Sequence, residues 1–575
     1  MNRILIFIIL LIPVWLFPQQ AVNVTGRISY RLLQTQYDEV SAIKPDSIPE
    51  SEYAKGTLIP GLQQSLNLAL FARSRGLDIT LLGDIRHDPW NELNQLERVQ
   101  RLSLSARFGL NNELVLGDFF ESGSEFFIQS REVRGGKLFL QFNNLWNNRS
   151  SLETKILGGR IERAQPIGAR IPNLYRQYNN SGQYRRYFAS ADIHLADADW
   201  FSLGLSYLYA RDDSLSINRS INEPLGNQNA GARASVFLWN KKIRLFGEGF
   251  TSRKDTLTGK AVDDYTYQAG VDLRYNRFKL IGSYYRLGYD YYTAGYPFLF
   301  NDRQGFKLNS AVWVGNVLTL FAEAEQYHNN LKERANIPQT TTRLLDAGFS
   351  TTSRQLPDIT LKVGLRDDKS PLLIDAFGNE TRTERLSLKY EGRLGYGFGA
   401  NRLSLTAMYI NLDDQSRFSA GTPLSTEQII TSMNVYTRPA ATFFLSGGLV
   451  FSRLLMSNNQ QNDNLYLYES SRWDIIPRKL QLETTISYIY NEATNGGYQD
   501  WLSDYNQLAG DVSLEWFLSS AISIKAIAGT DLRHMRYKTA EALMIIADPD
   551  YGPRFFNGFE SYDGLKYGVE LNWIF

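Results

Sequence analysis

An alternation of apolar and polar residues recurs along almost the whole chain and constrains its fold more than any other feature. The alternation is clearest in the last twelve residues, 564–575. Apolar side chains occupy every second position there, at Leu565, Tyr567, Val569, Leu571, Trp573 and Phe575. A period of two is typical of a β-strand with one apolar face and one polar face. The final segment is therefore predicted to be a strand.

The same period returns at regular intervals from Val22 onward. Clear examples are residues 66–73, 201–209, 359–366, 385–393 and 480–488. Each of these segments could be part of a strand that crosses a bilayer, which needs about nine to eleven tilted residues. The chain is therefore predicted to cross a membrane repeatedly as strands.

The connections between these segments alternate between short turns and longer polar loops. Outer-membrane barrels show that asymmetry, with tight turns on one side and long loops on the other. The sequence therefore predicts an all-β fold, a single large transmembrane antiparallel up-and-down β-barrel of about 26 strands, with 24 and 28 as alternative counts. The short turns are predicted at 74–76, 110–112, 197–199, 240–242, 276–277, 315–316, 356–358 and 397–401, and the longer loops include 36–60, 163–180, 290–303, 454–463 and 534–562.

The first 21 residues have the organisation of a secretory signal peptide. Arg3 is followed by an apolar run from Ile4 to Phe17 and then by polar Gln19 and Gln20. A run of that length suits a signal peptide better than a membrane span. Residues 1–21 are predicted to be the signal peptide, and residues 22–575 the barrel.

Composition narrows the chemistry open to the chain. Its 33 Tyr, 32 Phe and 10 Trp suit β-structure and lipid–water interfaces. A net charge of +1 gives no reason to expect nucleic acid as a partner. The chain has no Cys, and its four His are far apart in sequence, without metal-ligand spacing. We therefore predict no cofactor, no metal site and no enzymatic activity.

The terminal strand resembles the C-terminal strand of bacterial outer-membrane β-barrels, in which the assembly machinery reads a final Phe or Trp. The resemblance implies a location in the outer membrane, with its lipids, lipopolysaccharide and the barrel-assembly machinery as partners. It also implies an assembly signal formed by Tyr567, Val569, Leu571, Trp573 and Phe575.

The segment from Leu116 to Leu140 resembles a hairpin of the fimbrial usher barrel, in which Gly-Asp and Arg-Gly flank a loop. The chain departs from ushers elsewhere, since it has no room for their plug or periplasmic domains. On polar strand faces, Arg134 is predicted to form an ion pair in the lumen with Asp118 or Glu132.

A barrel of about 26 strands encloses a hole that would breach the membrane if it were empty. The bare 26-strand plan resembles the barrel of porin–cytochrome electron conduits. We therefore expect a conduit or secretion scaffold whose lumen holds a partner subunit or inward-folded loops, with 36–60 and 534–562 as candidate loops. A solute-conducting porin and a surface-display or adhesion scaffold are the alternatives. Lumen-facing aromatics at Phe71, Trp313 and Phe321 favour the first hypothesis.

Overall fold

The computed structural model describes most of the chain between Asn23 and Phe575. The predicted signal peptide, residues 1–21, lies outside the described residues. The described ranges are 23–39, 61–87, 99–146, 149–167, 181–218, 220–256, 259–352, 357–374, 378–417, 425–494, 504–535 and 562–575.

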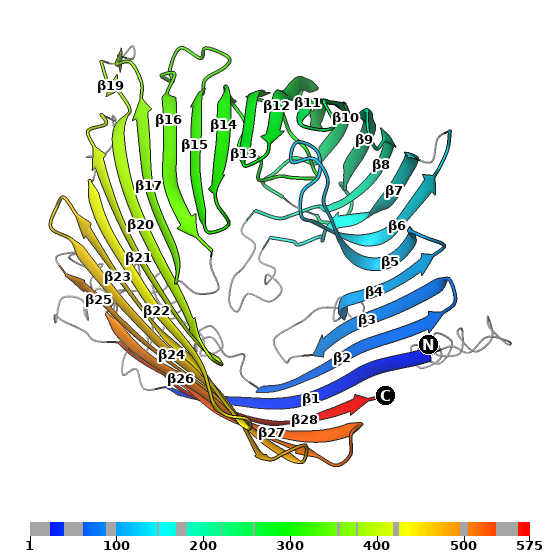
Figure 1. Cartoon of the computed structure of the whole chain (residues 1–575), viewed down its shortest axis with the longest axis vertical. Coiled ribbons are helices and arrows are strands. Elements are labelled where there is room, and N and C mark those ends of the chain that lie inside the picture. Colours follow the sequence, from blue (N-terminus) through cyan, green and yellow to red (C-terminus); the bar gives the residue numbers. More distant parts are fainter. Residues whose placement is uncertain are drawn as a thin grey trace.

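Twenty-six antiparallel strands form one closed sheet (Figure 1). Each strand pairs with the next in the chain, and the last strand pairs with the first, in a register that runs from Arg27 opposite Ile574 to Glu39 opposite Tyr562. The predicted single antiparallel barrel of about 26 strands is confirmed. Within the described ranges, no helix is long and apolar enough to cross a membrane.

The strands have the following bounds. The first half of the barrel contains β1 (Asn23–Glu39), β2 (Gly61–Ser74), β3 (Leu77–His87), β4 (Val99–Phe108), β5 (Asn112–Glu121), β6 (Arg131–Asn143), β7 (Ser150–Glu162), β8 (Arg185–Asp197), β9 (Phe201–Asp213), β10 (Leu225–Leu238), β11 (Ile243–Thr256), β12 (Val262–Tyr275) and β13 (Phe278–Leu287). The second half contains β14 (Arg303–Val314), β15 (Leu318–His328), β16 (Thr341–Thr351), β17 (Asp358–Lys369), β20 (Glu384–Phe398), β21 (Asn401–Asp414), β22 (Thr426–Ala440), β23 (Phe443–Met456), β24 (Gln461–Ile476), β25 (Leu480–Thr494), β26 (Tyr505–Phe517), β27 (Ile522–Met535) and β28 (Tyr562–Ile574).

Short turns gather at one end of the barrel, which we call the short-turn end. Two-residue turns join β2 to β3, β12 to β13 and β20 to β21. Gly76, Asn276 and Gly399 adopt positive φ there, with values of 81°, 48° and 61°. Tight hairpins need such conformations, and Gly and Asn adopt them at little cost.

The longer connections lie at the other end, which we call the long-loop end, as the sequence predicts. The connection predicted at 454–463 is an exception. β23 ends at Met456 and β24 begins at Gln461, so only four residues join them. The backbone closes tightly, since Met456 N donates to Gln460 O at 2.8 Å. The long-loop prediction was wrong here because the polar residues Gln461 to Asn464 continue the strand.

A small hairpin decorates the connection between β17 and β20. It consists of β18 (Leu373–Ile374) and β19 (Glu380–Thr381), which pair only with each other. Figure 1 shows β19 at the periphery, beyond the ends of the barrel strands.

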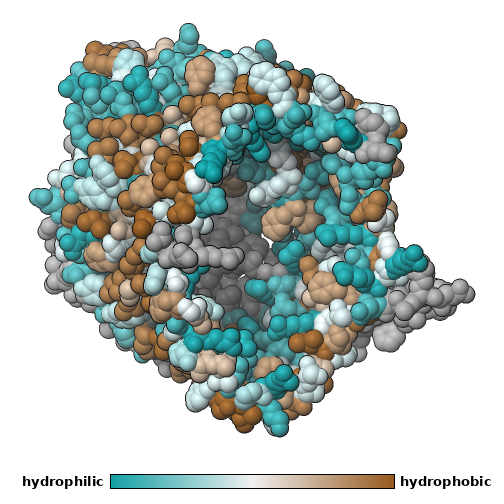
Figure 2. Space-filling model, viewed as in Figure 1, coloured by the Kyte–Doolittle hydropathy of each residue, from teal (hydrophilic) through white to brown (hydrophobic). Residues whose placement is uncertain are grey.

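The two faces of the wall differ in chemistry. On β28, Leu565, Val569 and Leu571 point outward and are exposed, whereas Glu570 and Asn572 point inward and are buried. Figure 2 shows hydrophilic residues around the central opening and hydrophobic residues over the outer flank. The alternation read from the sequence therefore separates an apolar exterior from a polar lumen.

Candidate functional site

The lumen is the candidate functional site, and its most distinctive feature is a hairpin that leaves the wall. β5 pairs with β4 only as far as Gly117, which lies opposite Ser103. Gly117 has a φ of 102°, and a Cβ at this position would lie 1.9 Å from the Leu102 carbonyl oxygen. Only glycine fits this close approach. The wall of the barrel therefore bends at Gly117.

The partner strand bends at the same level. The pairing of β6 with β7 ends at Arg134 opposite Arg160, so the first residues of β6 have no partner in β7. A Cβ on Gly135 would lie 2.0 Å from the Gly158 carbonyl oxygen. The glycines let β6 and β7 approach closely where the hairpin departs. We call residues 118–134 the inner hairpin.

The predicted lumen ion pair lies at the base of the inner hairpin. Asp118 and Arg134 are directly opposite each other in the register. Arg134 Nε donates to Asp118 Oδ1 at 2.5 Å, and Leu102 N donates to Asp118 Oδ2 at 2.7 Å. Glu132 is exposed and lies opposite Phe120 instead. The structure thus brings Asp118 and Arg134 together at the bend and leaves Glu132 outside the contact.

The tip of the inner hairpin rests on the connection between β13 and β14, residues 288–302, which we call the lumen loop. Tyr291 Oη donates to Phe126 O at 2.5 Å, and Thr293 Oγ1 donates to Phe127 O at 2.7 Å. A backbone bond from Gln129 N to Gly295 O at 3.2 Å adds a third contact. Figure 1 shows both segments inside the ring of strands.

Apolar side chains fill the space between these segments and the wall. The Phe127 and Phe250 rings stack with centroids 5.3 Å apart. Phe126 and Ile128 are buried in the same cluster, together with Phe188 and Leu208 from the inward faces of β8 and β9. Burial of this apolar area favours the inward position of the hairpin tip.

Inward polar groups anchor the lumen loop to the wall. The Tyr292 carbonyl oxygen accepts hydrogen bonds from Asn227, Asn229 and Ser252 at 3.1, 2.9 and 2.6 Å. Asn227 Oδ1 accepts a further bond from Ala294 N at 2.9 Å. Because the loop meets side chains of β10 and β11, its position is defined by the wall.

Charged groups surround the anchored segments. Arg186 bonds the carboxylates of Asp212 and Glu162 at 2.6 and 3.2 Å and the Tyr292 hydroxyl at 2.9 Å. Burial raises the pKa of the Tyr292 phenol, so this hydroxyl keeps its proton. Lys155 pairs with Glu121 at 2.7 Å on the hairpin itself. The charges in this part of the lumen are thus largely paired.

The opposite wall is less polar. Alternation places Met408, Ile410, Ile430, Val450 and Ile489 on the inward faces of β21, β22, β23 and β25, where all five are half-buried. We call these five residues the lumenal apolar patch. The predicted inward aromatics lie on other strands: Phe71 of β2 lines a cavity of about 690 Å³ with Thr25 and Ser103, and Trp313 and Phe321 fall on inward positions of β14 and β15.

The sequence predicts a long loop at 290–303, as observed, but neither the inward position of this lumen loop nor the tip of the inner hairpin was predicted. The three consecutive apolar residues Phe126, Phe127 and Ile128, within an otherwise polar connection, are the signal that could have identified the tip. The predicted cork segments 36–60 and 534–562 lie almost wholly outside the described residues. In the described part of the chain, no group of His, Cys, Asp and Glu could hold a metal ion.

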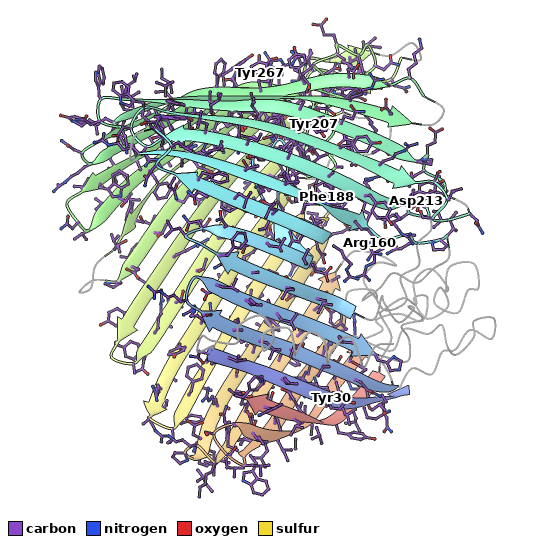
Figure 3. All side chains as sticks on the ribbon, turned by 90° about the vertical axis from the view of Figure 1, so that its right-hand side faces the viewer. Tyr30, Arg160, Phe188, Tyr207, Asp213 and Tyr267 are labelled. Carbon is purple, nitrogen blue, oxygen red and sulfur yellow. The ribbon has the colours of Figure 1, made fainter. Side chains whose placement is uncertain are left out.

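The exterior carries two rings of exposed aromatic residues. Trp200, Trp239, Trp473, Trp516 and Trp573 lie at the short-turn end, and Tyr187, Tyr209, Tyr265 and Tyr567 lie toward the long-loop end. Figure 3 shows Tyr30, Tyr207 and Tyr267 on the strands that face the viewer. An apolar band between aromatic girdles, around a polar lumen, is the pattern of outer-membrane barrels. The described part of the chain thus has the fold and the surface of an outer-membrane β-barrel.

Known proteins add little to this assignment. No protein-family model and no curated protein matches the chain. Among solved structures, it is similar to the siderophore receptor PirA from Pseudomonas aeruginosa, at 10% identity over 97% of this chain and 81% of that chain, with a TM-score of 0.41. For the P pilus usher (PapC) translocation pore, the identity is 12%, the coverages 95% and 99%, and the TM-score 0.29. For the copper transporter OprC, the identity is 9%, the coverages of this chain and that chain are 97% and 80%, and the TM-score is 0.43.

The assembly-signal residues close the outer-membrane barrel. Tyr567, Val569, Leu571 and Trp573 point outward from β28, which pairs with both β1 and β27. The Phe575 ring lies 4.8 Å from the Trp573 ring, and Gly26 N donates to Phe575 O at 2.8 Å. Recognition of these residues by the assembly machinery stays a prediction.

Proposed function

We propose that the protein is a wide outer-membrane conduit that is narrowed by its own inner hairpin and lumen loop and that receives a partner subunit in the remaining space. The observation that carries the proposal is the bend at Gly117, from which the hairpin tip reaches Tyr291 and Phe250 inside the barrel. A barrel of this size needs some closure to preserve the permeability barrier.

The lumenal apolar patch supports the partner subunit. The lumen of a water-filled barrel is ordinarily polar. Contact between water and the exposed parts of the Ile and Val side chains on this wall is unfavourable. A partner that covers Ile410, Ile430 and Val450 would remove this contact and would be stabilised by the burial.

Conductance in planar bilayers tests the narrowing. Replacing residues 122–130 with a two-residue Asn-Gly turn removes the tip and its contacts with the lumen loop. We expect a larger and noisier single-channel conductance than in the wild type. Removal of the peripheral residues 372–381, which contain β18 and β19, is the matched control and should leave conductance unchanged.

A solute-conducting pore is the second candidate. The cavity along β2 to β5 favours it, because Arg73, Arg101 and Arg107 line this cavity together with Ser103 and Ser105. A steady wild-type conductance that the 122–130 replacement does not change would favour this function over the narrowed conduit.

A further inference from the structure

One ionisable side chain on the exterior stands apart from the rest. Alternation along β24 places Leu465, Leu467, Glu469, Ser471 and Trp473 on the outward face. The intervening Tyr466 and Tyr468 point inward, where the Tyr468 hydroxyl bonds Asn434. Leu467 and Trp473 are exposed on the outer surface, which fixes the phase of this strand. Glu469 therefore faces lipid.

Its neighbours on β24 define its depth. Toward the long-loop end, Asp463 forms an outward ion pair with Arg453 at 2.8 Å, which marks the polar boundary. Trp473 marks the aromatic girdle at the short-turn end. A membrane-spanning strand takes about nine to eleven residues, which matches the separation of Asp463 and Trp473. Glu469 lies six residues after the first and four before the second, within the apolar band.

Other outward charges lie near strand ends. Arg211, Arg343 and Asp367 are each two residues from the end of β9, β16 or β17. Those side chains can reach water or lipid headgroups. Glu469 has no such route, since its strand continues for seven residues on one side and eight on the other.

Two hydroxyl groups accompany the carboxyl group. Thr484 Oγ1 from β25 lies 3.4 Å from Glu469 Oε2, and Ser471 Oγ lies 2.6 Å from Thr484 Oγ1. On the other side, Glu469 is directly opposite Gly447 of β23, which presents no side chain. The result is a small polar patch with no side chain on its Gly447 flank, surrounded by Leu445, Leu467 and Ile486.

A carboxyl group in hydrocarbon is costly unless it is hydrogen-bonded. The one long hydrogen bond from Thr484 leaves most of the hydrogen-bonding capacity of the Glu469 carboxyl group unused. A carboxyl group that holds its proton carries a donor and an acceptor, so two such groups related by a twofold axis satisfy each other. Gly447 lets the surfaces approach, as small residues do in membrane interfaces. We propose that the outer face of β23 to β25 is a membrane-embedded interface between two copies of this chain, centred on Glu469.

Self-association in lipid vesicles tests the interface. The cysteine-free chain allows a single fluorophore to be attached at Asn458→Cys, in the exposed turn between β23 and β24, close to the proposed interface. Donor- and acceptor-labelled barrels, reconstituted together in phosphatidylcholine–phosphatidylglycerol vesicles, should show energy transfer that falls as lipid dilutes the protein. Glu469→Leu should weaken association about tenfold. Glu469→Gln, which keeps a donor and an acceptor, should retain it.

Thr154→Leu on the outward face of β7 is the matched control and should leave association at the wild-type level. Heat-modifiable migration on gels verifies that every variant is folded. The interface is refuted if the wild type shows no energy transfer, or if Glu469→Leu associates as well as the wild type. Loss of association in Glu469→Gln as well as Glu469→Leu would overturn the pairing of two carboxyl groups.

Discussion

At the scale of single residues, the environment of a side chain on this wall is decided by the parity of its position. Leu388 and Ser387 are consecutive in β20, yet Leu388 lies opposite outward Leu365 and Ser387 lies opposite inward Arg366. One peptide unit thus separates hydrocarbon from the lumen.

This parity predicts unequal effects for the same substitution at adjacent positions. Leu388→Arg should lower the free energy of unfolding in lipid vesicles by roughly 2–4 kcal/mol, because it places a charge on the lipid face near mid-depth. Ser387→Arg should change it little, since the lumen accepts the charge. Guanidinium titration monitored by tryptophan fluorescence measures both, and equal losses would contradict the assignment of faces.

The pair at the base of the inner hairpin gives a second prediction at this scale. Asp118→Ala removes the carboxylate that accepts from the Leu102 amide and that pairs with the Arg134 guanidinium. Losing a satisfied acceptor costs about 1–3 kcal/mol, so the hairpin should open more often. Trypsin should then cleave faster after Arg131. Asp346→Ala, which removes a paired carboxylate on the inward face of β16, is the control, and its cleavage rate should match the wild type. Equal acceleration by both substitutions would show that Asp118 has no special role.

At the scale of elements, the inner hairpin and the lumen loop act as one unit because each supplies groups that the other needs. The carbonyl oxygens of Phe126 and Phe127 accept hydrogen bonds from the hydroxyls of Tyr291 and Thr293. The lumen loop in turn donates a hydrogen bond to Asn227. Release of the hairpin therefore requires the loss of several contacts together.

The double substitution Tyr291→Phe and Thr293→Val should loosen this unit while preserving its shape. Each removed hydroxyl costs about 0.5–1.5 kcal/mol. We expect more frequent transitions to a higher conductance in planar bilayers. Tyr289→Phe removes another hydroxyl of the lumen loop, one that accepts from Arg334 in the connection between β15 and β16, and should leave the traces unchanged. Unaltered traces in the double variant would show that the hydroxyls do not hold the hairpin.

The terminal strand is the second element with a testable role. Phe575 and Gly26 exchange backbone hydrogen bonds at 3.1 and 2.8 Å, where β28 meets β1. Replacing Phe575 with Ser should reduce the amount of heat-modifiable, folded protein in outer membranes and leave a protease-sensitive form. Trp516→Ser removes an outward aromatic at the same end of the barrel and should assemble normally. Normal assembly of the Phe575 variant would rule out its role as a signal.

At the scale of the whole molecule, the lumen has two unlike sides. One side carries the inner hairpin, the lumen loop and paired charges such as Arg186 with Asp212. The other carries the lumenal apolar patch. Because the removal of apolar surface from water lowers the free energy of the system, a partner is expected to bind on the patch side.

Cysteine labelling tests this arrangement in the cysteine-free chain. With Ile430→Cys, a water-soluble maleimide should react quickly in the purified barrel and slowly in native outer membranes, where the partner is present. Asn316→Cys, in a turn at the short-turn end, should react in both preparations and controls for reagent access. Equal rates for Ile430→Cys in the two preparations would argue against a partner on this wall.

The sequence by itself determined the barrel because the signals for it are local. Alternation assigns Leu388 outward and Ser387 inward, turn residues such as Gly76 and Asn276 mark where strands reverse, and counting them leads to 26 strands. The ion pair between Arg134 and Asp118 could also be predicted from the sequence, because these residues are only 16 positions apart on paired strands.

Only the tertiary structure decided where the hairpin goes. Phe126 meets Tyr291 across 165 residues of chain, and Phe127 stacks on Phe250. Alternation states which face a residue occupies but not which distant segment covers it. The bend at Gly117 likewise depends on its distance from Leu102 on another strand. Strand pattern is encoded within a few residues, whereas filling the lumen depends on contacts that exist only once the barrel has closed.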